Sequence, residues 1–304
     1  MNSVILCLFG LVTPIASTPP PITALAFSPD GKQILAGSQA GIEVYSWPEL
    51  KNLRKLNTKS SHIHDLAFSP DGRVLAAVGG EPAEQGTIEL FAWPDGKLLR
   101  TWSPHRDLIY SLSWSADSRS IYTASADQTV QRHEATSGKR LEKLEGHSRG
   151  ILAVQVLPDE VVVSAGLDES LRVWKEGSSI RNLTNHTRAV TGLALFPVRE
   201  GPPRIVSISD DRTVRLWQPS IGRMMRFKRL VSVPRAVAWS KAGIAVVCHD
   251  GSLHLLDPDT LETLHTYLTI KGVAYSLAIA SDGTIAVGGN AGQLKRVITS
   301  PSRP

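Results

Sequence analysis

Cysteine is scarce in this chain, and no hydrophobic run is long enough to cross a membrane. Two of the 304 residues are cysteines, Cys7 and Cys248, and they form no C-x-x-C pair. The sequence therefore indicates no disulfide framework, no cysteine-ligated zinc site and no haem attachment motif. The apolar run 4–12 falls well short of the ~20 residues that a membrane-spanning helix needs. We expect no stable membrane span.

Charge of one sign is also thinly spread. The chain has 33 basic and 28 acidic residues, a net charge of +5, and no block of like charge. We expect no nucleic-acid partner, because such binding usually depends on a concentrated basic surface. The most basic run, 223–229, is interpreted as part of a solvated outer strand. The alternative is that it contacts a phosphate or an acidic partner.

What the sequence does contain is a repeat. Two consecutive segments carry the same ordered set of His, Ser, Asp and Trp: His147, Ser164, Asp168 and Trp174, then His186, Ser207, Asp211 and Trp217. In both segments Asp follows Ser by four residues and Trp follows Asp by six. A partial third copy precedes them, with His105 and Asp127 kept, but with Thr123 in place of Ser and His133 in place of Trp.

Similar units extend along most of the chain. The units lie at about 22–57, 63–102, 108–144, 147–183, 186–228, 234–268 and 273–299. Each unit has an alternating first strand, a short second strand, a tight turn, a third strand and usually a fourth. Asp127, Asp168, Asp211 and Asp250 are 41, 43 and 39 residues apart. This period predicts an all-β fold, a seven-bladed β-propeller with four-stranded antiparallel blades.

The units resemble WD40 repeats. They share the GH…D…W order, with R-V-W and R-L-W where that family usually closes with W-D. The resemblance covers about 22–299 and implies one WD40-type propeller over 18–304. It also implies that each His, Ser, Asp and Trp set forms a hydrogen-bonded network inside its blade. The chain is similar, too, to bacterial WD40 proteins that carry an export leader directly before their first strand.

His147, Ser164 and Asp168 are also the residue types of a hydrolase triad. The set recurs, whole or in part, in three consecutive units, whereas an active site is normally built once. Tight corners between strands bury polar backbone groups that need partners, which a His–Asp pair can supply. We therefore interpret the sets as structural. We predict no catalytic residue, no metal ligand and no cofactor, since no Walker loop, EF-hand loop or dinucleotide motif occurs.

Residues 1–17 precede the first unit and allow two interpretations. The run 4–12 has the length of a signal-peptide core, and Ile15 and Ser17 fit the positions before a cleavage site. We predict a signal peptide and hence an exported protein, periplasmic or extracellular. The alternative is that 3–9 forms the strand that completes the last unit, which supplies only three strands, and that the protein is cytoplasmic.

A rigid ring of blades presents loops on which binding residues concentrate. We predict a non-enzymatic protein–protein interaction scaffold that is monomeric on its own. The candidate contacts hold equivalent places in units four and five, namely Arg149 and Arg188 two residues after His, and Leu167 and Asp210 just before Asp.

Two alternatives remain. One is a propeller enzyme or small-ligand binder that uses the central channel, and the other is a partner of a redox or cytochrome assembly. The first strands are small and apolar, with Asp65 as their one carboxylate, which argues against an active site in the channel.

Overall fold

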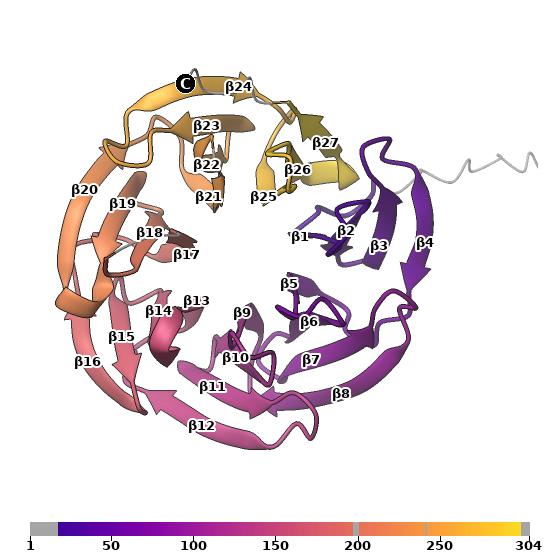
Figure 1. The fold of residues 1–304 in the computed structure, drawn as a ribbon, viewed down its shortest axis with the longest axis horizontal. Helices are drawn as coiled ribbons and strands as arrows, with labels where there is room; N and C mark the ends of the chain where they lie inside the picture. Colours follow the sequence, from indigo (N-terminus) through magenta and orange to yellow (C-terminus); the bar gives the residue numbers. More distant parts are fainter. Residues whose placement is uncertain (1–17, 197–200, 241, 299–304) are drawn as a thin grey trace, which may run out of the picture.

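The chain folds into a ring of antiparallel sheets around a central channel. The computed structural model describes residues 18–196, 201–240 and 242–298. Within these residues there are seven sheets, arranged as blades (Figure 1). The predicted seven-bladed all-β propeller is therefore confirmed.

Each blade runs outward from the channel in chain order. The innermost strands are β1 (Ala24–Phe27), β5 (Ile63–Phe68), β9 (Ile109–Trp114), β13 (Ile151–Val156), β17 (Val190–Phe196), β21 (Pro234–Ser240) and β25 (Ala274–Ile279). The second strands are β2 (Gln33–Ser38), β6 (Val74–Glu81), β10 (Ser120–Ser125), β14 (Val162–Gly166), β18 (Arg204–Ser209), β22 (Gly243–Cys248) and β26 (Ile285–Gly289).

The remaining strands lie toward the rim. The third strands are β3 (Gly41–Ser46), β7 (Gln85–Ala92), β11 (Thr129–Glu134), β15 (Leu171–Lys175), β19 (Thr213–Gln218), β23 (Ser252–Leu256) and β27 (Leu294–Val297). The outermost strands are β4 (Asn52–Leu56), β8 (Leu98–His105), β12 (Arg140–Glu145), β16 (Ser178–Leu183), β20 (Arg223–Arg229) and β24 (Thr263–Leu268). Short 3-10 turns occupy Pro158–Glu160, Pro219–Ile221 and Asn290–Gly292.

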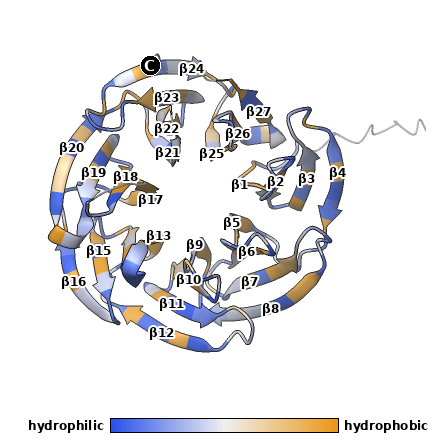
Figure 2. Ribbon diagram, in the orientation of Figure 1, coloured by the Kyte–Doolittle hydropathy of each residue, from blue (hydrophilic) through white to orange (hydrophobic). Residues whose placement is uncertain are grey.

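Strands near the rim of the ring are more exposed than strands farther in. Every residue of β10 and β22 is buried, because the second strands are covered on both faces by neighbouring blades. Outer strands such as β16 are almost wholly exposed. Figure 2 shows the same gradient, with hydrophobic residues dense on the inner strands and mixed with hydrophilic ones on the outer strands.

The core of the described chain is divided into seven clusters, one at each interface between neighbouring blades. The cluster between the third and fourth blades, for example, joins Tyr122 and Val130 to Ile151 and Trp174. Because each cluster needs side chains from two blades, a blade cannot bury its apolar faces alone. Stability therefore depends on the complete ring.

The ring closes between the last blade and the first within the described residues. Ile22 donates its amide to the carbonyl of Gly289 at 3.1 Å, and the Ser276 hydroxyl donates to the carbonyl of Ile22 at 2.9 Å. An apolar cluster that contains Leu25, Ile34 and Ala286 fills the same interface.

The predicted four-stranded blades are found in six of the seven sheets, but the last sheet of the described chain has three strands, β25 to β27. The predicted signal peptide at 1–17, its alternative as a closing strand, and Cys7 lie outside the described residues. Cys248 is a free, buried cysteine on β22, and burial raises its pKa to about 12.

The turns between first and second strands have the chemistry that the S-P-D-G sequence predicts. The Ser28 hydroxyl donates to the Asp30 carboxylate at 2.6 Å, and the same carboxylate accepts the Lys32 amide at 3.1 Å. Gly31 has a φ of +69°, a conformation that glycine adopts without strain. These turns mark one side of the ring, which we call the turn face.

Candidate functional site

The fourth blade contains a complete relay of hydrogen bonds. Trp174 donates its indole N–H to Ser164 Oγ at 2.8 Å, and Ser164 Oγ lies 2.8 Å from His147 Nε2. His147 Nδ1 lies 2.9 Å from both carboxylate oxygens of Asp168. One placement of hydrogens satisfies every atom: indole to hydroxyl, hydroxyl to imidazole, imidazole to carboxylate. The relay joins the third strand, the second strand, the loop before the first strand and the tight turn.

The fifth blade repeats this geometry. Trp217 donates to Ser207 at 2.8 Å, Ser207 lies 2.8 Å from His186 Nε2, and His186 Nδ1 lies 2.8 Å from Asp211. Arg215 adds an ion pair to Asp211 at 3.5 Å.

The third blade contains the shorter relay that its substitutions predict. His105 lies 2.8 Å from Thr123 Oγ1 through Nε2 and 2.8 Å from Asp127 through Nδ1. His133 stands in the tryptophan position and packs edge-on against Trp102, with ring centroids 6.1 Å apart. Its Nδ1 is buried without a hydrogen-bond partner among the described residues. The relay in this blade therefore stops at Thr123.

The carboxylates of these relays are held in the ionised form. Burial opposes ionisation of Asp211, but hydrogen bonds from Thr213 and His186 outweigh it and lower the pKa of that carboxyl to about 2. The same balance, with His147 as the main donor, holds the pKa of Asp168 well below its usual range. Burial also lowers the pKa of His186, which Asp211 only partly offsets. The Asp168 and Asp211 carboxylates are therefore charged at neutral pH and paired with the relay histidines.

The hydroxyls of the two complete relays are sealed from solvent. Ser164 and Ser207 have 0% exposed surface. A nucleophile must contact its substrate. A substrate could not reach either hydroxyl oxygen unless the blade opened. The geometry thus supports the interpretation that the sets hold the blade together.

Each relay fixes a loop and a turn on the same side of the ring. The Asp168 carboxylate accepts the Ser148 amide at 3.1 Å, and the amide of Leu167 donates to the carbonyl of Gly150 at 2.9 Å. In the fifth blade the amide of Asp210 donates to Ala189 at 3.0 Å. We call this side, formed by the loops before the first strands and the tight turns before the third strands, the loop face.

The four candidate contact residues lie on the loop face. Arg149 and Arg188 are exposed, and Leu167 and Asp210 are half-buried. Arg149 Nη1 donates to the Leu167 carbonyl at 3.3 Å, which makes these two residues one local unit. Asp210 instead pairs with Arg235 of the next blade at 3.7 Å. The structure therefore leaves the guanidinium groups of Arg149 and Arg188 without an acidic partner among the described residues.

The channel holds polar residues that the sequence interpretation missed. Seven half-buried side chains form a ring around the channel. One lies just before β1, and each of the others is the second residue of an innermost strand: Thr23, His64, Tyr110, Leu152, Thr191, Arg235 and Tyr275. These residues line a cavity of about 200 Å3. Alignment of the seven first strands on one another would have revealed them, whereas reading each strand singly showed only small apolar residues.

Neither a metal site nor a membrane-spanning helix is found in the part of the chain that the structure describes. No group of three or more His, Cys, Asp or Glu side chains there could hold a metal ion. No helix in that part is long and apolar enough to cross a membrane.

Blades that repeat about every 40 residues and are fastened by His–Ser/Thr–Asp relays define a class of repeat propeller. The sequence model of the WD domain, G-beta repeat, matches residues 12–45, 50–91, 96–131, 138–175 and 177–218. Together these segments cover more than half of the chain. The chain therefore belongs to the WD40 repeat family.

Relatives from several eukaryotes share the repeat region. Mouse telomerase protein component 1 is 28% identical over 297 residues, which is 90% of this chain and 11% of that protein. The zebrafish p21-activated protein kinase-interacting protein 1-like is 26% identical over 175 residues, 56% of this chain and 46% of that protein. Ribosome biogenesis protein YTM1 of Candida glabrata is 28% identical over 168 residues, 48% of this chain and 36% of that protein.

The chain thus spans less than half the length of each of these relatives. They are eukaryotic proteins, and the resemblance to bacterial proteins with an export leader stays a prediction.

Proposed function

We propose that this chain is a non-enzymatic scaffold that binds partner proteins on its loop face. The observation that carries the proposal is the equivalent placement of Arg149 and Arg188, both exposed on neighbouring blades. Each follows a relay histidine, His147 or His186, that is buried and anchored to a carboxylate. The two cations are therefore presented on a rigid base, which limits the entropy lost on binding.

The chemistry of the two arginines favours an acidic partner. A guanidinium group presents a planar set of donors that matches carboxylate oxygens. Complementary charge at the rim of an interface mainly speeds and orients association. The name of the zebrafish relative describes that protein as interacting with a protein kinase, which supports an interaction role for this architecture.

The test is partner capture with matched charge reversals. The variant Arg149→Glu/Arg188→Glu alters the loop face, and Arg73→Glu/Arg119→Glu alters two exposed arginines that follow equivalent turns on the turn face. Cross-linking mass spectrometry then locates any captured protein. We expect the loop-face variant to lose the partner and the turn-face variant to keep it. Equal loss in both variants, cross-links confined to the turn face, or no partner for the unmodified protein would refute the proposal.

One observation favours a second candidate function, the binding of a small polar ligand in the channel. His64 Nε2, Thr191 Oγ1 and Arg235 Nε are buried without a hydrogen-bond partner among the described residues. All three side chains line the channel cavity, and buried polar atoms normally have partners. Native mass spectrometry of protein from its own host would show a bound ligand, and Thr191→Val should weaken its retention. If the spectra contain only the mass of the protein without a ligand, this second candidate function is wrong.

A further inference from the structure

One position beside the relays differs between the third blade and the two blades that follow it. Four residues after the turn aspartate, the fourth and fifth blades have Arg172 and Arg215, whereas the third blade has Gln131. Arg215 lies against its own turn: its Nε donates to Thr213 Oγ1 at 3.1 Å and its Nη2 lies 3.5 Å from Asp211. The arginine thus occupies the space beside the relay of the fifth blade.

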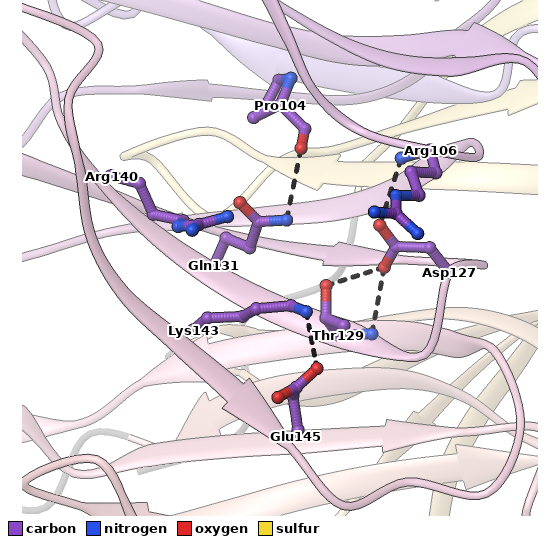
Figure 3. A pocket seen from close by; sticks show the side chains of 8 residues that line it. All are labelled: Pro104, Arg106, Asp127, Thr129, Gln131, Arg140, Lys143 and Glu145. Carbon is purple, nitrogen blue, oxygen red and sulfur yellow. Dashed lines mark hydrogen bonds and ion pairs between the residues drawn. The ribbon is translucent and has the colours of Figure 1, made fainter.

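Gln131 is too short to occupy the matching space. Its Nε2 donates to the Pro104 carbonyl at 3.3 Å and lies 3.2 Å from His105 Nδ1. Its Oε1 is buried without a hydrogen-bond partner among the described residues. Beside it lies a pocket of about 260 Å3 (Figure 3). The pocket thus lies beside the position at which the third blade has glutamine in place of arginine.

Three cationic side chains line the pocket, from the loop before β9 and from β12. They are Arg106, Arg140 and Lys143. Figure 3 shows Arg140 and Arg106 on opposite sides of Gln131. Lys143 pairs with Glu145 at 2.5 Å, but the side chains of Arg106 and Arg140 make no hydrogen bond or ion pair with any residue in the described part of the chain.

The other acidic group of the pocket, Asp127, forms no ion pair with these arginines. Asp127 Oδ2 lies 2.8 Å from His105 Nδ1 and accepts the Arg106 amide at 3.2 Å. Its Oδ1 accepts the amide of Thr129 at 3.0 Å and the hydroxyl of Thr129 at 2.7 Å. Both oxygens therefore form their hydrogen bonds within the relay and the tight turn, and the two guanidinium groups at the pocket have no ion-pair partner among the described residues.

We propose that this pocket binds a phosphate monoester. Two guanidinium forks match an anion with three terminal oxygens and nearly two negative charges. The unpaired Oε1 of Gln131 supplies an acceptor for an N–H or O–H of the group that carries the phosphate. The carrier is either a free small molecule or a phosphorylated side chain of a partner protein. The site is separate from Arg149 and Arg188 and does not rest on the scaffold proposal.

Calorimetric titration with inorganic phosphate, O-phosphoserine and a phosphoserine peptide, at constant ionic strength, tests the site. We expect Arg106→Gln/Arg140→Gln to weaken binding by about tenfold or more. Gln131→Arg, which restores the side chain of the neighbouring blades, should remove binding by filling the pocket. The control Arg73→Gln/Arg119→Gln removes two exposed arginines of the turn face and should bind like the unmodified protein.

The titrations distinguish the two possible carriers of the phosphate and can also refute the site. Binding that is no tighter for the phosphoserine peptide than for the smaller probes supports a small-molecule ligand, and tighter binding of the peptide supports a partner side chain. Failure of the unmodified protein to bind any probe at millimolar concentration overturns the proposal, as does an equal loss in the turn-face control. Thermal unfolding of each variant shows that the blade is intact, and Arg140→Lys, which keeps the charge, should retain part of the affinity.

Discussion

The carboxylate of Asp65 on β5 accepts a hydrogen bond from the amide of Leu112 on β9, with 2.9 Å between oxygen and nitrogen. Its other oxygen accepts the amide of Leu66 at 2.8 Å. The Asp65 carboxylate thus joins the second blade to the third at the wall of the channel. Burial raises the pKa of Asp65 to about 6, although these hydrogen bonds oppose the rise.

Asp65 should make the stability of the ring depend on pH. Its pKa of about 6 in the folded protein lies above its usual value of 3.8, so folding favours the protonated form. Its contribution is fully present below the usual value and is lost as pH rises through about 6. Between pH 4 and pH 7 the unmodified protein should lose roughly 1–3 kcal/mol relative to Asp65→Asn. Urea unfolding of both proteins measures this, and a constant difference would contradict it.

Removal of one relay hydroxyl should destabilise the fourth blade. Ser164→Ala leaves Trp174 Nε1 and His147 Nε2 without the oxygen that both contact at 2.8 Å. Buried polar groups left unpaired typically cost about 1–3 kcal/mol, and we expect a loss of this size in the free energy of unfolding. Ser148→Ala, at an exposed position two strands away from the indole, is the control and should have little effect. Equal effects would mean that the relay adds no stability.

His133, which stands in the tryptophan position of the third blade, should make the protein less stable in acid. Burial, together with the charges of His105 and Arg140, lowers the pKa of His133 to about 4. Because its usual value is 6.5, the contribution of this residue is present above that pH and is lost as pH falls toward 4.

His133→Phe keeps a ring against Trp102 and removes the titration. We expect this variant to lose less stability than the unmodified protein between pH 7 and pH 4.5, as measured by denaturant midpoints. His265→Phe, at an exposed histidine, should follow the unmodified protein. Parallel curves for all three proteins would show that His133 is not the acid-sensitive group.

The leader prediction can be tested by mass. Residues 1–17 lie outside the described chain, and their sequence predicts removal by a signal peptidase after Ser17. Protein from the native host should then have the intact mass of 18–304 and begin at Thr18. A mass that includes 1–17 would favour the alternative closing strand and a protein that is not exported.

Much of the fold could be predicted because the repeated information is local. The S-P-D-G turns and the Ser–Asp–Trp spacing each lie within one unit and recur at a constant period. The His147–Asp168 pair could be expected for the same reason, since both members belong to one repeat. The ring of channel residues was missed because each blade contributes one member, and these members meet only when the seven first strands converge.

What the sequence determined by itself is therefore the repeat, the number of blades and the residues of each relay. The Asp65 link between blades was decided by the tertiary structure. So was the pocket beside Gln131, whose walls come from a loop and from β11 and β12. The physical reason is that a strand pattern depends on neighbours in the chain, whereas a cavity or a buried charge depends on which side chains from separate strands fill the space around it.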